Sequence, residues 1–119
     1  LEEEIFPSSK LIKIYKECHL YINLSRIESF GITLIEGLAS QLPVITFDTK
    51  GGNELVIDNH NGKVLKNYSA EEMANAIIDY QKNSSLYEIH KKNTLVSVEQ
   101  FDLNKISEKT IKVYKDLIS

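Results

Sequence analysis

Apolar residues fall into short continuous runs separated by stretches with helical spacing. The runs at residues 20–24 and 44–47 are short and bounded by polar residues, which is typical of strands. The first run shows little alternation, so we expect a strand covered on both faces. A turn at residues 58–62 precedes a third predicted strand at residues 63–65. Residues 32–40 have a helical pattern, and this order of elements predicts a right-handed βαβ unit.

A helix is predicted before the first strand, because apolar residues recur there at helical spacing. It begins at Ser8 or Ser9, whose hydroxyl groups can cap it. Its apolar face is expected to consist of Leu11, Ile12, Ile14 and Tyr15. His19 follows this helix and is interpreted as a helix-end or strand-edge residue, because no catalytic partner lies near it in the sequence.

Three helices are predicted after the third strand. The sequence SAEE at residues 69–72 is a capping box for a helix that ends near residue 82. The sequence SLYE at residues 85–88 is a second capping box, for a helix in which His90 lies among lysines and is expected at the surface. A last helix is predicted over residues 103–117. The buried face of the first of these helices is expected to consist of Met73, Ala76, Ile77 and Tyr80.

The loop and helix after the first strand contain the best candidate site. Ligands in parallel α/β sheets bind beyond the carboxyl ends of the strands, where Glu28 and residues 48–54 are both expected. Gly31 precedes the predicted helix, whose first-turn N–H groups and dipole favour an anion. Glu28 and Glu36 lie before and after this position in the sequence, and their carboxylates can accept hydrogen bonds from hydroxyl groups. A ligand with an anionic group between two groups that carry several hydroxyls is a nucleotide sugar.

The spacing of the two glutamates fits such a ligand. Glu36 follows Glu28 by eight residues and falls on the first or second helical turn, on the order of 10 Å away. A structural alternative stays open at this point. Residues 33–36 also have the spacing of a capping box, in which Glu36 would only satisfy a backbone N–H.

Composition limits the function classes. The 119 residues, 42% apolar and 26% charged with a net charge of −3, suit one small domain. Mild acidity argues against a nucleic-acid surface, and we find no metal-spaced His/Cys cluster. The sequence has no apolar run of about 18 residues and no signal-peptide pattern. The single Cys18 cannot form an internal disulfide, which fits a reducing compartment. Because the chain starts at Leu1, we expect a piece of a longer protein.

Several motifs resemble those of family 4 retaining glycosyltransferases. The sequence ESFGITLIEGLA at residues 28–39, followed by PVI at residues 43–45, is similar to the family pattern E-G-F-G-(x)-x-x-x-E-A-x-A and P-V. The sequence DTKGGNELV at residues 48–56 resembles the loop D-V-G-G-x-P-E-I-V. The sequence NGKVL at residues 61–65 resembles the segment n-G-x-L-v. Ser29 stands where the family commonly has glycine.

The resemblance implies the C-terminal, donor-binding half of a GT-B fold. Residues 1–119 would form a single partial domain with an α/β, Rossmann-like parallel sheet flanked by helices, and with C-terminal helices. The N-terminal acceptor domain would precede Leu1, as would the segments whose Arg and Lys hold the diphosphate. We therefore expect the fragment alone to be inactive.

The resemblance also implies the donor site. Glu28, the catalytic residue, would bind donor-sugar hydroxyls, and Glu36 would bind the ribose. The donor-binding residues would be Glu28, Ser29, Phe30, Gly31, Ile32, Thr33, Leu34 and Glu36. Lys50 and Gly51 are additional candidate loop contacts, although the glycine pair at residues 51–52 also fits a plain turn.

The implied reaction transfers a hexose-type sugar from a UDP- or GDP-linked donor to a glycan or lipid-linked acceptor. It would retain the anomeric configuration and need no cofactor or metal. The implied setting is polysaccharide or glycoconjugate biosynthesis in the cytoplasm, with peripheral association of the full-length protein at the inner membrane face left open. Three alternatives stay open: a nucleotide-sugar epimerase, a sugar phosphorylase of related fold, and a non-catalytic sugar-nucleotide-binding module.

Overall fold

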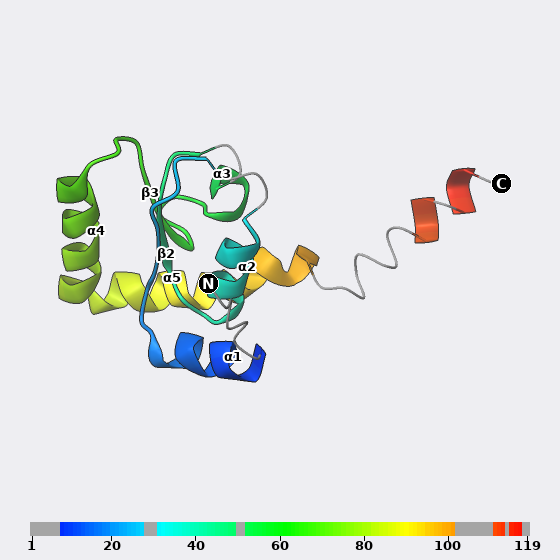
Figure 1. Ribbon diagram of the computed structural model, residues 1–119, viewed down its shortest axis with the longest axis horizontal. Helices are drawn as coiled ribbons and strands as arrows, with labels where there is room; N and C mark the ends of the chain where they lie inside the picture. Colours follow the sequence, from blue (N-terminus) through cyan, green and yellow to red (C-terminus); the bar gives the residue numbers. More distant parts are fainter. Residues whose placement is uncertain (1–7, 28–30, 50–51, 102–110, 114, 118–119) are drawn as a thin grey trace, which may run out of the picture.

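A three-stranded parallel sheet forms the centre of the chain (Figure 1). The computed structural model describes residues 8–27, 31–49, 52–101, 111–113 and 115–117. The strands are β1 (Tyr21–Asn23), β2 (Val44–Phe47) and β3 (Gly62–Leu65). Their order in the sheet is β1–β2–β3, and Ile45 pairs with Ile22 on one side and Lys63 on the other. The predicted α/β fold with a parallel sheet is confirmed.

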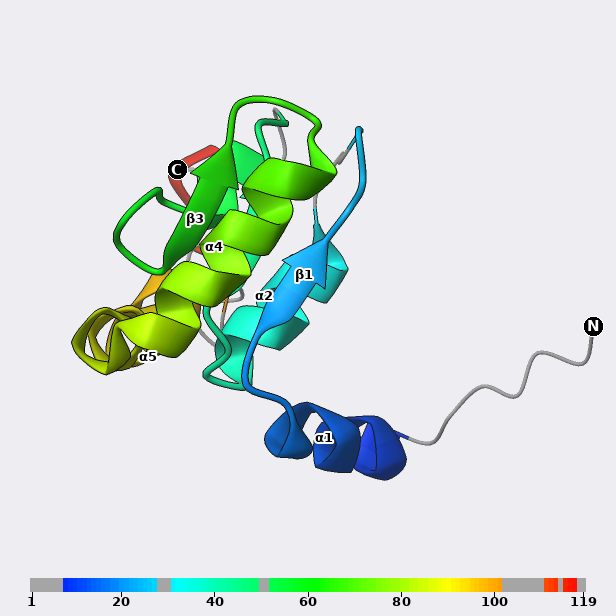
Figure 2. The ribbon, with the colours of Figure 1, turned by 90° about the vertical axis from the view of Figure 1, so that its left-hand side faces the viewer.

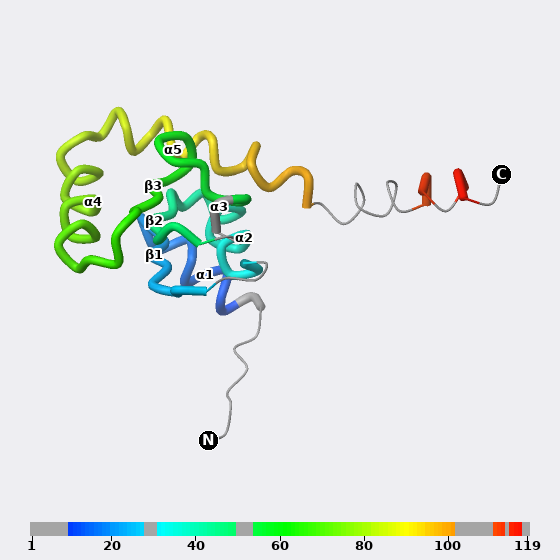
Figure 3. Tube along the Cα trace, turned by 90° about the horizontal axis from the view of Figure 1, so that it is seen from above, coloured from blue at the N-terminus to red at the C-terminus, as the bar shows by residue number. Residues whose placement is uncertain are grey.

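Helices cover both faces of this sheet, which gives three layers. α2 (Ile32–Ala39) connects β1 to β2, and α4 (Ala70–Lys82) follows β3 and lies on the opposite face (Figure 2). α5 (Ser84–Val98) runs across one end of both layers and contacts α2 as well as α4 (Figure 3). Further helical segments are α1 (Ser8–Glu17), α3 (Gly52–Leu55) and the 3-10 turn η1 (Glu99–Phe101).

The middle strand supplies both hydrophobic cores. All four residues of β2 are buried, and successive side chains of a strand point to opposite faces. Val44 packs with Leu34 and Leu38 of α2, whereas Ile45 and Phe47 pack on the α4 side. The buried face predicted for α4 is confirmed for Met73, Ala76 and Tyr80, and Ile77 packs against the same core. A continuous apolar run is therefore what this central strand requires.

The edge strand β1 differs from its prediction. Ile22 is 41% exposed, and Leu24, just after the strand, is 58% exposed. The expectation of a strand covered on both faces is wrong, because β1 lies at the edge of the described sheet. Its last residue, Asn23, is buried and donates a hydrogen bond from Nδ2 to Thr46 Oγ1 at 3.3 Å.

Two helix starts test the predicted capping boxes. The Ser69 side chain accepts a hydrogen bond from the backbone N–H of Glu72, which confirms the cap of α4. The reciprocal half of the predicted box is wrong, because the Ser69 N–H donates to the carbonyl of Asn67 and the Glu72 carboxylate accepts from the Asn67 amide. The cap predicted at Ser85 is wrong, because Asn83 Oδ1 accepts from the backbone N–H of Leu86 at 3.0 Å. α5 consequently begins at Ser84. Within the last predicted helix, residues 111–113 and 115–117 are helical, and the others lie outside the described residues.

The surface position predicted for His90 is also wrong. Its side chain is fully buried between α5 and α4, with Nδ1 2.6 Å from the hydroxyl of Tyr80. Burial lowers the pKa of His90, and it raises the pKa of Tyr80, so the tyrosine hydroxyl stays protonated. A neutral His90 can therefore accept this hydrogen bond at Nδ1.

A buried amide fixes the turn between α3 and β3. Asn61 Oδ1 accepts from the backbone N–H of Ile57 at 2.8 Å. Its Nδ2 donates to the carbonyl of Leu55 at 2.9 Å and to Ser97 Oγ at 2.7 Å. One side chain thus joins α3, the turn and α5.

Candidate functional site

The start of α2 lies at the carboxyl end of β1, as the sequence predicts. Gly31 is the N-cap residue, with φ 78° and ψ 46°, and its carbonyl accepts from the backbone N–H of Ile35. This left-handed conformation favours glycine, because a side chain there would cost about 1–2 kcal/mol. Among the described residues, no side chain caps this helix. Within that part of the chain, the first-turn N–H groups therefore have no competing side-chain acceptor at the cap.

The capping alternative for Glu36 is wrong. Helix α2 begins at Ile32, so Thr33 is already inside the first turn and is not the cap residue. Glu36 instead lies on the second turn, where its side chain is half-buried. Its carboxylate Oε2 accepts a hydrogen bond from the hydroxyl of Tyr15 at 3.0 Å.

Tyr15 reaches Glu36 from helix α1. Burial is the main cause that raises the pKa of Tyr15, and the hydrogen bond to Glu36 adds to it. The phenol therefore stays protonated at neutral pH and acts as the donor. A hollow of about 520 Å³ adjoins this pair between α1 and α2. Its lining residues are Leu11, Ile12, Tyr15, Lys16, Glu36, Ala39, Ser40 and Gln41.

A second hollow, of about 250 Å³, lies where the three strands end. The Arg26 guanidinium lies 4.3 Å from the centre of the Tyr68 ring, and the Tyr68 hydroxyl donates to the carbonyl of Leu24 at 2.8 Å. Asp48 and Lys66 complete its charged lining, which also includes Phe47 and Thr49. The loops after β1, β2 and β3 therefore converge at the carboxyl edge of the sheet, as expected for a parallel α/β site.

The structure describes part of the predicted donor-binding set. Gly31, Ile32, Thr33 and Leu34 form the start of α2, and Glu36 follows one turn later. The Leu34 side chain is fully buried in the core, so only its backbone can contact a ligand. Five predicted residues lie outside the described residues: Glu28, Ser29, Phe30, Lys50 and Gly51. The roles predicted for them stay predictions.

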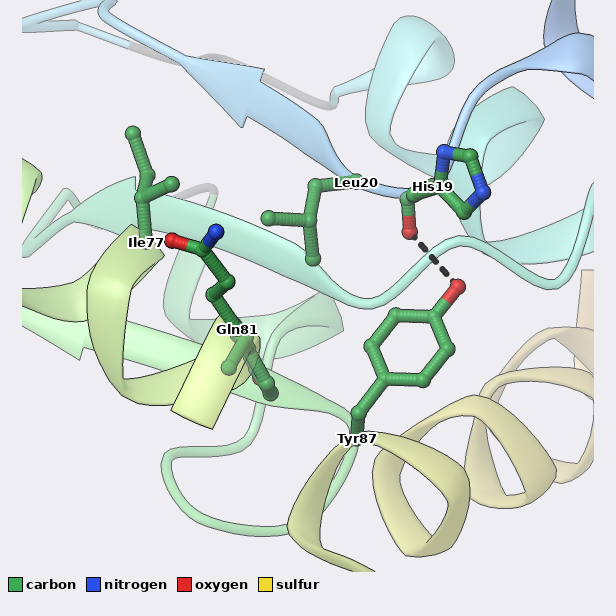
Figure 4. Close-up of a pocket in the computed structure, with 6 residues that line it drawn as sticks. His19, Leu20, Ile77, Gln81 and Tyr87 are labelled. Atoms are coloured by element: carbon green, nitrogen blue, oxygen red, sulfur yellow. Dashed lines mark hydrogen bonds between the residues drawn. The ribbon is translucent and has the colours of Figure 1, made fainter. Parts of the chain in front are cut away.

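A third hollow lies at the other end of the sheet (Figure 4). Its volume is about 360 Å³, and its lining residues are His19, Leu20, Ile77, Tyr80, Gln81 and Tyr87. The Tyr87 hydroxyl donates to the carbonyl of His19 at 3.0 Å and closes one side (Figure 4). Because His19 and Leu20 precede β1, this hollow is at the opposite end of the strand from Gly31 and is separate from the candidate site.

Sequence reasoning missed the polar role of Tyr15. The helical pattern assigned Tyr15 to the apolar face of the first helix, where only its ring was considered. A tyrosine on a core-facing side usually needs a partner for its hydroxyl, and that expectation could have singled it out. Its partner, Glu36, lies 21 residues further along the chain and in another helix.

The fold and site together define a parallel α/β domain with a helix N-terminus at the carboxyl edge of its sheet, and no side chain from the described ranges caps that helix. The chain belongs to the glycosyl transferases group 1 family, whose model matches residues 5–96. It is 29% identical over 120 residues to the UDP-N-acetylglucosamine–peptide N-acetylglucosaminyltransferase GtfA subunit of Streptococcus parasanguinis. That match covers 97% of this chain and 23% of the relative.

Solved structures show the same fold. The pneumococcal O-GlcNAc transferase GtfA, in complex with UDP and GlcNAc, matches with a TM-score of 0.78 and 27% identity. This match covers 91% of our chain and 23% of that chain. The C-terminal domain of a group 1 glycosyl transferase (LpcC) from Francisella tularensis matches with a TM-score of 0.70 and 23% identity, over 79% of our chain and 48% of that one.

The chain is short relative to these proteins. It spans between 13% and 31% of the length of the first five curated relatives. No helix among the described residues is both long and apolar enough to cross a membrane.

Proposed function

We propose that this chain is the donor-binding part of a glycosyltransferase that uses a nucleotide-diphosphate sugar. The observation that carries the proposal is the start of α2 at Gly31, which no side chain of the described residues caps, with the Glu36 carboxylate held one turn further along the same helix. The first feature suits a diphosphate and the second suits the hydroxyls of a ribose. Membership of the group 1 family supports the same assignment.

A UDP-linked sugar is the first donor to test. The relative from S. parasanguinis is named for UDP-N-acetylglucosamine, and pneumococcal GtfA was solved with UDP and GlcNAc. We propose a hexose-type sugar on UDP, with GDP as the second nucleotide to examine. In this arrangement, Glu28 contacts the donor sugar and Glu36 contacts the ribose.

The proposed reaction retains the anomeric configuration. The bond between the sugar C1 and the diphosphate oxygen breaks, and the acceptor hydroxyl forms its bond to C1 on the same face. The acceptor proton passes to the departing phosphate. As the C1–oxygen bond breaks, negative charge builds on the leaving diphosphate, and N–H groups of the α2 first turn stabilise it because they are already oriented. The two glutamates position the donor and transfer no proton, unlike the carboxylate pair of a glycosidase.

The rest of the reaction is assigned to the longer protein. We propose that another domain binds a glycan or lipid-linked acceptor and that further basic residues hold the diphosphate, so this fragment alone is inactive. The proposed setting is polysaccharide or glycoconjugate biosynthesis in the cytoplasm, with the whole enzyme at the inner face of the membrane.

The test compares three variants of the full-length protein. Glu36→Ala should weaken UDP binding about tenfold or more, because a hydrogen bond to a charged group is lost. Glu28→Ala should mainly lower turnover. Glu88→Gln is the matched control, since Glu88 is exposed on α5 near the opposite end of the sheet, and it should change neither quantity.

Titration calorimetry with UDP and GDP, and a sugar-transfer assay, give the two readouts. Unchanged nucleotide affinity in Glu36→Ala, or normal turnover in Glu28→Ala, would reject the assignment. Release of free sugar without an acceptor would favour a phosphorylase-like or epimerase-like relative.

A further inference from the structure

We propose that Tyr15 is a positioning residue that orients the Glu36 carboxylate toward the ribose of the nucleotide. This inference rests on the function proposed above. The two side chains come from different helices, and their hydrogen bond of 3.0 Å joins Tyr15 on α1 to Oε2 of Glu36 on α2. Helix α1 thereby contributes to the donor site without contacting the donor.

The chemistry of the pair suits orientation. A carboxylate can accept about four hydrogen bonds, and the tyrosine hydroxyl uses one position on Oε2. Oε1 and the remaining lone pair have no other hydrogen-bond partner among the residues that the structure describes, and they can accept from a ribose diol. Tyrosine is also a neutral donor, so it restricts the Glu36 side chain without cancelling the charge that strengthens hydrogen bonds to hydroxyl groups. An oriented carboxylate loses less conformational freedom when the nucleotide binds.

The ring of Tyr15 is itself supported. It packs against the ring of Tyr21 on β1, with 6.2 Å between centroids and 34° between planes. Tyr21 in turn lies directly against α2 at Gly37, where an added Cβ would approach its Cγ to 2.9 Å. The absence of a side chain at Gly37 therefore lets Tyr21 lie close to α2, and Tyr21 supports the ring whose hydroxyl binds Glu36. This packing fixes both ends of the hydrogen bond.

The test measures how strongly the full-length protein distinguishes UDP from 2′-deoxy-UDP. In the unaltered protein, the ratio of the two dissociation constants should be about tenfold or more, and Glu36→Ala should bring it close to one. Tyr15→Phe keeps the ring and removes only the donor, and it should lower the ratio about threefold. Tyr87→Phe is the matched control, because it also removes one donating tyrosine hydroxyl but lies at the hollow separate from the candidate site, and it should leave the ratio unchanged.

A double variant separates positioning from general packing. If Tyr15 acts only through Glu36, then Tyr15→Phe should have no further effect on either nucleotide in the Glu36→Ala background. An unchanged ratio in Tyr15→Phe, or equal weakening of both nucleotides, would overturn the role of Tyr15 and leave the proposed function intact. A ratio near one in the unaltered protein, or no binding of UDP and GDP, would instead reject the ribose site and the inference together.

Discussion

Replacement of Gly62 by alanine should destabilise the sheet more than the addition of one methyl group suggests. Gly62 begins β3 and pairs with Val44 of β2. A Cβ at this position would overlap the carbonyl oxygen of Val44 and lie 2.9 Å from Cγ1 of Val56. The obstacle is backbone, so relief requires that β2 and β3 separate.

The magnitude follows from what this separation breaks. The hydrogen bond from the Val44 N–H to the Asn61 carbonyl is already 3.4 Å long, so a small displacement removes it. The adjacent Asn61 side chain would also lose part of its hydrogen bonding to the backbone of Leu55 and Ile57. About 1 kcal/mol for each of one or two hydrogen bonds, with 1–3 kcal/mol for overpacking, gives a cost of about 3 kcal/mol. The melting temperature should fall by roughly 10 °C.

The assay is urea and thermal unfolding of the chain, followed by circular dichroism. Gly37→Ala is the matched control, because the same methyl group there meets the side chain of Tyr21 and gains about 1 kcal/mol of helix propensity. The atoms that this methyl group meets are near the backbone of Tyr21 and must shift, so overpacking of about 1–3 kcal/mol less the gain in helix propensity gives a net cost of about 0–2 kcal/mol, still below the cost at Gly62. A Gly62→Ala variant that is no less stable than Gly37→Ala would refute the reasoning.

Two further predictions concern α5. Because the pKa of buried His90 is lowered on folding, the unfolded chain binds the proton more readily, and stability should fall as the pH drops below about 6.5. Unfolding free energies between pH 7 and 5 should show a shallower slope in His90→Asn. For the helix start, Asn83→Ala should cost about 1 kcal/mol in urea unfolding and Ser85→Ala close to none, since Asn83 accepts from the Leu86 N–H. Equal costs would contradict this cap.

The sheet was predictable because its signal is local. A buried central strand must be apolar at every position, and residues 44–47 meet this requirement without reference to the rest of the chain. The edge position of β1 could not be read in this way, because the exposure of Ile22 depends on which strands lie beside it. The spacing and type of residues indicate that a segment is a strand, whereas the neighbouring strands and helices determine how far its side chains are exposed.

The two wrong predictions for α5, its cap and the exposure of His90, have different causes: competing local signals for the cap and a distant packing partner for His90. Asn83 and Ser85 are both good capping residues, and only the backbone conformation selects Asn83. His90 has lysines beside it in the sequence, but its packing partner Tyr80 lies on another helix. The same limit applies to the candidate site. The position of Gly31 before a helix is a local pattern, whereas the bond between Tyr15 and Glu36 is not.

The path of α5 has a practical consequence for where the chain can be shortened. Leu86 and Tyr87, near its start, pack against the core beneath α4, whereas Val98 and Phe101, at and beyond its end, pack against the core beneath α2. The region matched by the family model stops at residue 96. A protein cut there would lack Val98 and Phe101 and would expose the core that supports the candidate donor site. Any expression boundary should therefore lie beyond Phe101.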